Sequence, residues 1–121
     1  MKAVVDTNIL IDYLSGSNKA KEELDAFDDL YISLITWMEI LVGAEEGKEE
    51  EEIREFLRRF RVHAVDEGVA ERAVEIRRRE KIRLPDAIIW ATALQLGILL
   101  VTRNTRDFPS KHPGIRVPYR L

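Results

Sequence analysis

Apolar residues along this chain follow two patterns, short unbroken runs and longer segments with helical spacing. The runs at residues 2–6, 31–34 and 98–102 are rich in Val, Ile and Leu, as expected of strands buried on both faces. Shorter stretches at 62–65 and 115–118 are also predicted to be strands. The pattern therefore predicts a sheet of short, buried strands.

Between these runs, apolar residues recur every three or four positions, which predicts helices that each bury one face. Turn-forming residues at 15–18 and the glycine-containing stretch at 43–47 interrupt the helical pattern. Pro85 suits the first turn of a helix, and Gly97 suits its end. The predicted helices cover residues 7–14, 19–28, 36–43, 49–61, 67–80 and 86–96. Strands that alternate with helices predict an α/β fold with a mostly parallel sheet, in one domain over residues 1–121.

The composition is that of a globular domain that can bury its own core. Of the 121 residues, 45% are hydrophobic and 34% are charged. The absence of cysteine excludes a disulfide scaffold, a thiolate metal site and cysteine catalysis. No apolar run approaches the roughly 20 residues that span a bilayer, and the N-terminus lacks the pattern of a signal peptide. We therefore expect a cytoplasmic protein without a membrane partner.

The net charge of −3 hides an uneven distribution of charged residues. Six glutamates lie within residues 45–52, on what is predicted to be a solvated helix start. Outside this stretch, Lys and Arg slightly outnumber Asp and Glu, with clusters at 77–83 and 103–120. A local basic surface that contacts nucleic acid is thus compatible with a mildly acidic chain.

Polar residues with chemical potential follow the predicted strands. Asp6 ends the first strand, and Glu39 lies in the helix after the second. Asp86 begins the helix before the fourth strand, and Asn104 and Asp107 follow that strand. Because sites in parallel sheets form at the carboxyl ends of strands, we expect these residues to meet at one edge.

Each of these side chains also has an ordinary structural interpretation. Asp6 could cap the helix that follows it, and Asp86 could interact with a helix dipole. Glu39 fits a capping box that begins at Thr36, and Asn104 could cap a turn. Asp107 could simply be an acid at the protein surface.

The local contexts of three acids favour a shared site. Asp6, Glu39 and Asp86 interrupt apolar segments, where an isolated carboxylate is costly and neighbouring carboxylates repel. A divalent cation would relieve this repulsion. Oxygen ligands without His or Cys favour a hard ion, Mg²⁺ or Mn²⁺.

Four segments resemble the motifs of PIN domains, in the form found in VapC-type toxins. They are VVDTNIL at 4–10, SLITWMEILVG at 33–43, LPDAIIWATA at 84–93 and LVTRNTRDF at 100–108. The motifs occur in order and span the chain.

This resemblance implies a three-layer PIN fold, with a mostly parallel sheet in the order 3-2-1-4-5 flanked by helices. It also implies a metal-dependent ribonuclease, usually the toxin of a toxin–antitoxin pair. The family's three acids correspond to Asp6, Glu39 and Asp86. The fourth position is often Asp in the family and is Asn104 here, so Asp107 is an alternative source of a carboxylate.

We assign roles on this basis. Asp6 and Asp86 are the expected ligands of the main metal, and Glu39 is expected to bind metal or orient the attacking water. Asn104 is expected to hydrogen-bond a metal-bound water or a carboxylate. Candidate supporting residues are Thr7, Asn8, Thr102 and Asp107. Candidate RNA-binding residues are Arg79, Lys81, Arg83, Arg103 and Arg106, although the cations near residue 80 could equally complement a helix dipole.

Partners and rival functions follow from the same reasoning. The predicted helices at 19–28 and 49–61 could form a groove for a VapB-like antitoxin, and the resemblance implies a homodimer. A non-catalytic PIN-like interaction module is one alternative. A metal-dependent phosphatase or DNA nuclease that uses the same acids is another.

Overall fold

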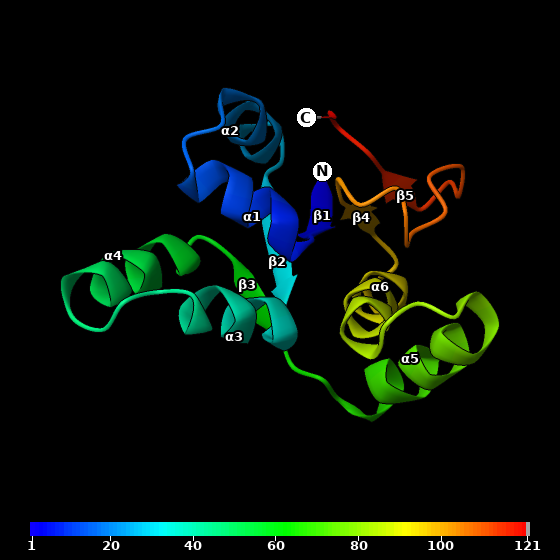
Figure 1. Cartoon of the computed structure of the whole chain (residues 1–121). Coiled ribbons are helices and arrows are strands. Elements are labelled where there is room, and N and C mark those ends of the chain that lie inside the picture. Colours follow the sequence, from blue (N-terminus) through cyan, green and yellow to red (C-terminus); the bar gives the residue numbers. More distant parts are fainter. Residues whose placement is uncertain (121) are drawn as a thin grey trace.

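A five-stranded sheet forms the centre of the computed structural model, which describes residues 1–120 (Figure 1). The strands lie in the order β3-β2-β1-β4-β5, and every neighbouring pair is parallel. The strands are β1 (Lys2–Val5), β2 (Asp29–Ser33), β3 (Arg61–His63), β4 (Leu99–Val101) and β5 (Ile115–Arg116). The predicted fold class and strand order are therefore confirmed.

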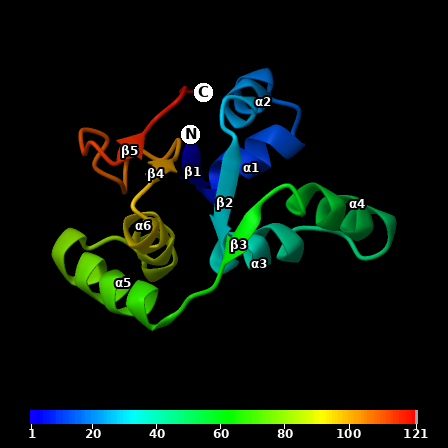
Figure 2. The same cartoon turned by 180° about the vertical axis from the view of Figure 1, so that it is seen from behind.

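Six helices flank the sheet on both faces, which gives three layers (Figures 1 and 2). The helices are α1 (Thr7–Leu14), α2 (Asn18–Asp25), α3 (Leu34–Val42), α4 (Lys48–Leu57), α5 (Glu67–Glu80) and α6 (Leu84–Leu96). Helices α5 and α6 pack on one face against a core that includes Val4 and Leu100. Helices α1 to α4 pack on the other face, against Ala3, Val5 and Val101. Adjacent strand residues thus enter opposite cores, as the period-two geometry of a strand requires.

Local sequence signals explain where several helices begin and end. The Asp6 carboxylate accepts from the N–H of the next residue at the start of α1, and the Asp66 side chain caps α5 in a similar way. Pro85 lies in the first turn of α6, where its missing N–H costs nothing. Gly97 ends that helix at φ 69°, a left-handed conformation that glycine adopts without strain.

Element ends differ from the predicted ones where local turns intervene. Helix α2 ends at Asp25 rather than at residue 28, and β2 begins at Asp29. Helix α4 ends at Leu57, because residues 58–60 tighten into a turn before β3. Helix α3 begins earlier than expected, because the Ser33 hydroxyl caps it. Within residues 1–120, no helix is long and apolar enough to cross a membrane.

The register of the sheet brings distant parts of the chain together at its carboxyl edge. Val5 of β1 lies beside Val101 of β4, and the N–H of Asp6 donates to the Val101 carbonyl at 2.9 Å. Asp6 and Thr102, which follow these two strands, are therefore neighbours although 96 residues separate them. This edge is where the predicted site residues were expected to meet.

Candidate active site

A cavity of about 550 Å³ opens at the carboxyl edge of the sheet. It receives residues from the start of α1, from α3, from the start of α6 and from the loop after β4. Its lining residues are Asp6, Thr7, Asn8, Ile11, Glu39, Arg83, Asp86, Arg103, Asn104, Thr105, Arg106 and Asp107. The structure therefore brings the three predicted acids and both candidates for the fourth position into one cavity.

Asp6 is the most deeply buried acid of this cavity, with 4% of its surface exposed. Its Oδ1 accepts from the Thr7 N–H at 2.8 Å, so the predicted helix cap is confirmed. Its Oδ2 accepts from the Thr102 hydroxyl at 2.7 Å and from the Asn8 amide at 3.3 Å. Burial raises the pKa of Asp6 to about 6; the Thr102 hydrogen bond opposes this rise, and the charges of Asp86 and Glu39 add to it.

Glu39 reaches the cavity from α3 and is held by the first residue of α1. The Thr7 hydroxyl donates to Glu39 Oε1 at 2.7 Å and lies 3.0 Å from the hydroxyl oxygen of Thr36. Thr36 is fully buried inside α3, and Ser33 caps that helix. The capping-box interpretation of Thr36 and Glu39 is therefore wrong, because the helix begins one turn of backbone earlier than that interpretation requires.

Asp86 lies in the first turn of α6 with one carboxylate oxygen unsatisfied. Its Oδ2 is buried and accepts no hydrogen bond, although Arg83 Nη2 lies 3.5 Å away. Burial raises the pKa of Asp86; Arg83 opposes this rise, and the charges of Asp107 and Glu39 contribute to it. A buried anionic oxygen without a donor is costly, which distinguishes Asp86 from an acid that merely complements a helix dipole.

Asn104 and Asp107 form one tight turn after β4. Asn104 Oδ1 accepts from the N–H groups of Arg106 and Asp107 at 3.1 Å, which confirms the predicted turn cap. The Asn104 side-chain amide also donates to Asp107 Oδ2 at 2.9 Å. The Asn104 N–H donates to the Thr102 hydroxyl, which itself contacts Asp6. The turn thus connects both candidates for the fourth position to the buried acid.

The five candidate RNA-binding residues do not all lie at the acidic cavity. Arg83, Arg103 and Arg106 line the acidic cavity, whereas Arg79 lines a different cavity. Lys81 ends α5 in a left-handed conformation with φ 57°. The basic side chains at the cavity thus come from the residue before α6 and from the loop after β4.

Comparisons with known proteins agree with this geometry. The family model described as "PIN domain" matches residues 3–111. The chain belongs to the PIN domain family. This confirms the family predicted from the four sequence motifs.

Relatives within the PIN family are similar over most of their length. Ribonuclease VapC10 of Mycobacterium tuberculosis is 35% identical over 114 residues, covering 88% of this chain and 85% of the relative. Ribonuclease VapC1 of Methanocaldococcus jannaschii is 31% identical over 122 residues, covering 96% and 86%. A toxin–antitoxin complex from Klebsiella pneumoniae contains a chain with 46% identity and a TM-score of 0.92, covering 98% and 99%. FitAcB from Neisseria gonorrhoeae has 28% identity and a TM-score of 0.81, also covering 98% and 99%.

The acids of this PIN domain have the chemistry that a hard cation requires, although they are not arranged as a complete set of metal ligands. Among residues 1–120, no three His, Cys, Asp or Glu side chains are arranged as a metal-binding group. The donors are nevertheless all oxygens, and the buried Asp86 Oδ2 has no hydrogen-bond donor. Oxygen donors of this kind are the ligands that hard divalent cations prefer.

Asp12 is a residue behind this site, bound to the cavity residue Arg103, that sequence reasoning missed. It is buried in α1, one helical turn beyond Asn8, and both of its oxygens bind Arg103, at 2.6 and 2.9 Å. The available signal was an acid among the apolar residues of 9–14, which is unusual on a buried helix face. Its arginine partner could not be identified, because it is 91 residues away in sequence.

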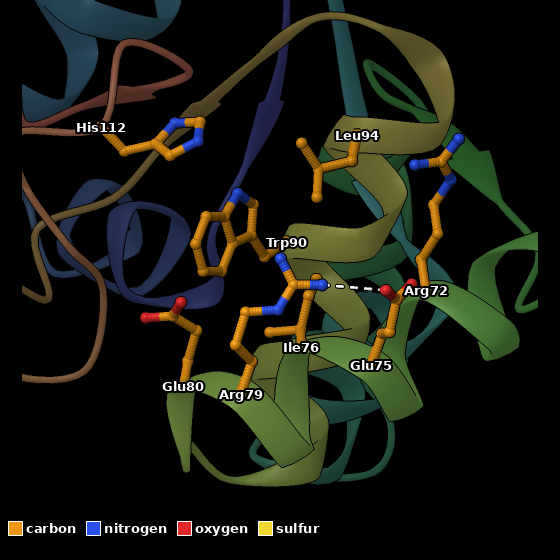
Figure 3. A pocket seen from close by; sticks show the side chains of 8 residues that line it. All are labelled: Arg72, Glu75, Ile76, Arg79, Glu80, Trp90, Leu94 and His112. Carbon is orange, nitrogen blue, oxygen red and sulfur yellow. Dashed lines mark hydrogen bonds and ion pairs between the residues drawn. The ribbon is translucent and has the colours of Figure 1, made fainter.

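A second cavity, of about 390 Å³, lies between α5, α6 and the loop before β5 (Figure 3). Trp90 contributes one wall; it is buried, as expected of a core residue, and packs edge-on against His112. Arg79 is paired here with Glu75 at 2.8 Å. His112 Nδ1 accepts from a backbone N–H at 3.0 Å. Arg79 and Glu75 of this cavity are thus matched to each other, whereas the buried Trp90 Nε1 has no hydrogen-bond partner within residues 1–120.

Proposed function

We propose that this protein is a metal-dependent endoribonuclease, the toxin of a type II toxin–antitoxin pair, which hydrolyses RNA phosphodiester bonds with Mg²⁺ or Mn²⁺. The observation that carries the proposal is the acidic cavity. Four carboxylates line it, the pKa values of Asp6 and Asp86 are raised, and a buried Asp86 oxygen has no hydrogen-bond donor. Such crowding is unfavourable in the free protein and is relieved by a cation.

The chemistry of the side chains supports particular roles. Asp6 and Asp86 would hold the metal, with Glu39 as a further ligand or as the group that orients the attacking water. A bound divalent cation would lower the pKa of that water and offset the charge of the scissile phosphate. Thr102 and Thr7 hold the carboxylates of Asp6 and Glu39 in place by hydrogen bonds of 2.7 Å.

The remaining polar groups support binding of a nucleic-acid chain. The guanidinium groups of Arg83 and Arg106 are exposed at the cavity and suit phosphate oxygens. The Oδ1 of Asp107 and the second N–H of the Asn104 amide make no hydrogen bond within residues 1–120, so they could contact water or a ligand of the metal. RNA is the favoured substrate because two relatives in this family are named ribonucleases.

The proposed partners are a VapB-like antitoxin and a second copy of the chain. Similar solved structures are VapBC and other toxin–antitoxin complexes. For the antitoxin we propose the surface formed by α1, α2 and α4, where Tyr13 stacks on Phe56 with centroids 4.9 Å apart. Arg59 lies over both rings and 3.7 Å from Asp25 of α2, so these helices form one continuous surface.

A cleavage assay with three substrates tests the proposal. The purified protein is incubated with single-stranded RNA, single-stranded DNA and a phosphate monoester, in Mg²⁺, in Mn²⁺ and in EDTA. We expect cleavage of RNA alone, and only with metal. Cleavage of DNA or release of phosphate from the monoester would favour the rival hydrolases. No reaction with any substrate would favour the non-catalytic interaction module.

A further inference from the structure

A buried carboxylate behind the acidic cavity joins three separate parts of the chain. Asp12 of α1 receives Arg103 Nε at 2.6 Å and Nη2 at 2.9 Å. The hydroxyl of Tyr119, in the C-terminal segment after β5, donates to the same carboxylate at 2.8 Å. The Asp12 side chain is only 7% exposed, so water competes little for these bonds.

Arg103 connects this buried cluster to the cavity. Its backbone N–H donates to Asn8 Oδ1 at 3.3 Å, and its sequence neighbours are Thr102, which contacts Asp6, and Asn104. Its side chain, which is 32% exposed, also lines the cavity. Asp12 therefore orients the guanidinium group of Arg103, which lies at the same cavity as the acids.

The pairing leaves part of the guanidinium group available. Asp12 uses the Nε and Nη2 edge, and Nη1 makes no hydrogen bond within residues 1–120. A guanidinium group held on one edge is already oriented before a phosphate arrives, so little side-chain entropy is lost on binding. Without Asp12, the same side chain would have to be ordered by the substrate.

We propose that Asp12, with Tyr119, is a positioning residue that orients Arg103 as a phosphate contact and holds the turn that carries Asn104. The inference rests on the proposed function, since it assigns a substrate contact within the same cavity. It identifies the ligand of Arg103 as a backbone phosphate of the nucleic acid next to the acids.

The chain contains a second ion pair that serves as a matched control. Arg116 of β5 binds Glu23 of α2 through Nε at 2.6 Å and Nη2 at 2.9 Å, and Glu23 is also 7% exposed. Neither residue lines the acidic cavity. A purely structural contribution should therefore be similar for the two pairs, whereas a contribution to substrate binding should belong to Asp12 alone.

Charge alone predicts the opposite result for Asp12. Asp12→Asn removes a negative charge near a site for a polyanion, so a general electrostatic effect would tighten RNA binding. Loss of positioning would weaken binding instead. The sign of the change in affinity therefore separates the two explanations.

The experiment compares Asp12→Asn with Glu23→Gln in the full chain. RNA affinity is measured in EDTA, where RNA stays intact, by fluorescence anisotropy over a range of salt. The constants kcat and KM are measured with Mn²⁺, well below the melting temperature of each variant. For Asp12→Asn we expect binding to weaken about 10-fold and kcat to fall about 10-fold. The slope of log Kd against log salt should decrease by roughly 0.7, the value for one phosphate contact to a single strand.

The control and two milder variants complete the test. Glu23→Gln should lower the melting temperature about as much as Asp12→Asn while leaving kcat, KM and Kd unchanged. Tyr119→Phe keeps every charge and should produce a smaller loss in the same direction. Arg103→Lys keeps the charge without the two-pronged geometry, so it should preserve the salt slope but lower kcat. These two variants carry the test if Asp12→Asn does not fold.

Other results would overturn the inference. RNA binding by Asp12→Asn that is unchanged or tighter, with kcat unchanged, would contradict it, as would equal losses of kcat in Glu23→Gln. If the wild-type protein neither binds nor cleaves RNA, the proposed function itself fails. If the wild type cleaves RNA and the Asp12 and Tyr119 variants cleave and bind it equally well, the proposed function stands and only the positioning role fails.

Discussion

Two cavities are lined by residues of the same helix, α6, and they differ in how their charged side chains are paired. The acidic cavity contains Asp86 from the first turn of α6, and the other contains Trp90 from the next turn (Figure 3). In the Trp90 cavity, Arg79 pairs with Glu75 at 2.8 Å, and Arg72 donates to Gln95 at 2.9 Å. Arg79, Glu75 and Arg72 therefore have protein partners there, whereas the buried Trp90 Nε1 has no hydrogen-bond partner within residues 1–120.

Four carboxylates line the acidic cavity, and of these only Asp86 has an ion-pair partner within residues 1–120. Arg83, at 3.5 Å, is the nearest cation to the Asp86 carboxylate, and the charges of neighbouring acids raise the pKa of Asp86 further. Charge that remains unmatched in a folded protein is unfavourable, so its presence indicates a ligand more strongly than the size of a cavity does. The comparison therefore directs experiments to the acids at the N-terminal end of α6.

The largest expected effect is the loss of cleavage in Asp86→Asn. The amide has nearly the same size but is a poor ligand for a hard cation, so the fold should persist while kcat/KM for RNA falls at least about 100-fold. The matched control is Glu80→Gln in the Trp90 cavity, for which kcat/KM should stay within about twofold of wild type. Near-normal cleavage by Asp86→Asn would remove the functional distinction between the cavities.

Metal should stabilise the folded protein through the acidic cavity. An ion that binds only the folded state adds about 2.7 kcal/mol to the free energy of unfolding when its free concentration is about 100 times its Kd. We therefore expect the melting temperature to rise with Mg²⁺ or Mn²⁺ at pH 8 and to return to its starting value with EDTA. The gain should shrink below about pH 6, the pKa of Asp6, because a protonated carboxylate coordinates poorly. A gain that persists unchanged in Asp86→Asn would place the ion elsewhere.

Asp6→Asn should stabilise the metal-free protein at neutral and higher pH. The raised pKa of Asp6 means that the folded state binds this proton more tightly than the unfolded state. In wild type, stability is therefore lost as the pH rises from about 4 to about 6, by about 3 kcal/mol for a shift of this size. Weaker hydrogen bonds to Thr102 offset part of the gain, so we expect roughly 1–2 kcal/mol in urea unfolding at pH 8.

The advantage of Asp6→Asn should disappear near pH 4, where the wild-type carboxylate is also largely neutral. Equal stability of the two proteins at both pH values would show that burial and neighbouring charges do not raise the pKa of Asp6. Metal should no longer stabilise the variant, which makes it a second control for the melting experiment.

The smallest effect is expected in the Trp90 cavity. Glu75→Gln removes an ion pair in which both side chains are about 70% exposed, so water already screens most of the attraction. The free energy of unfolding should change by no more than about 0.5 kcal/mol, and cleavage of RNA should be unaffected. A large loss of cleavage would mean that this cavity, too, takes part in function.

Local signals in the sequence were enough to predict the order of the elements and the principal acids. The Asp6 cap, the start of α6 at Pro85 and its end at Gly97 each depend on a few neighbouring residues. Motifs around these positions were sufficient to identify the PIN family. The bounds of α2 and α4 were less accurate, because short turns at their ends carry little apolar pattern.

Tertiary structure alone decided which arginines line the acidic cavity and how they are paired. Arg79 and Arg83 are four residues apart, yet they line different cavities on either side of the α5–α6 connection. The pairing of Asp12 with Arg103 depends on the alignment of Val5 with Val101 between β1 and β4. Periodicity and capping act over a few residues, whereas this pairing exists only once the parallel sheet has brought the two strand ends together.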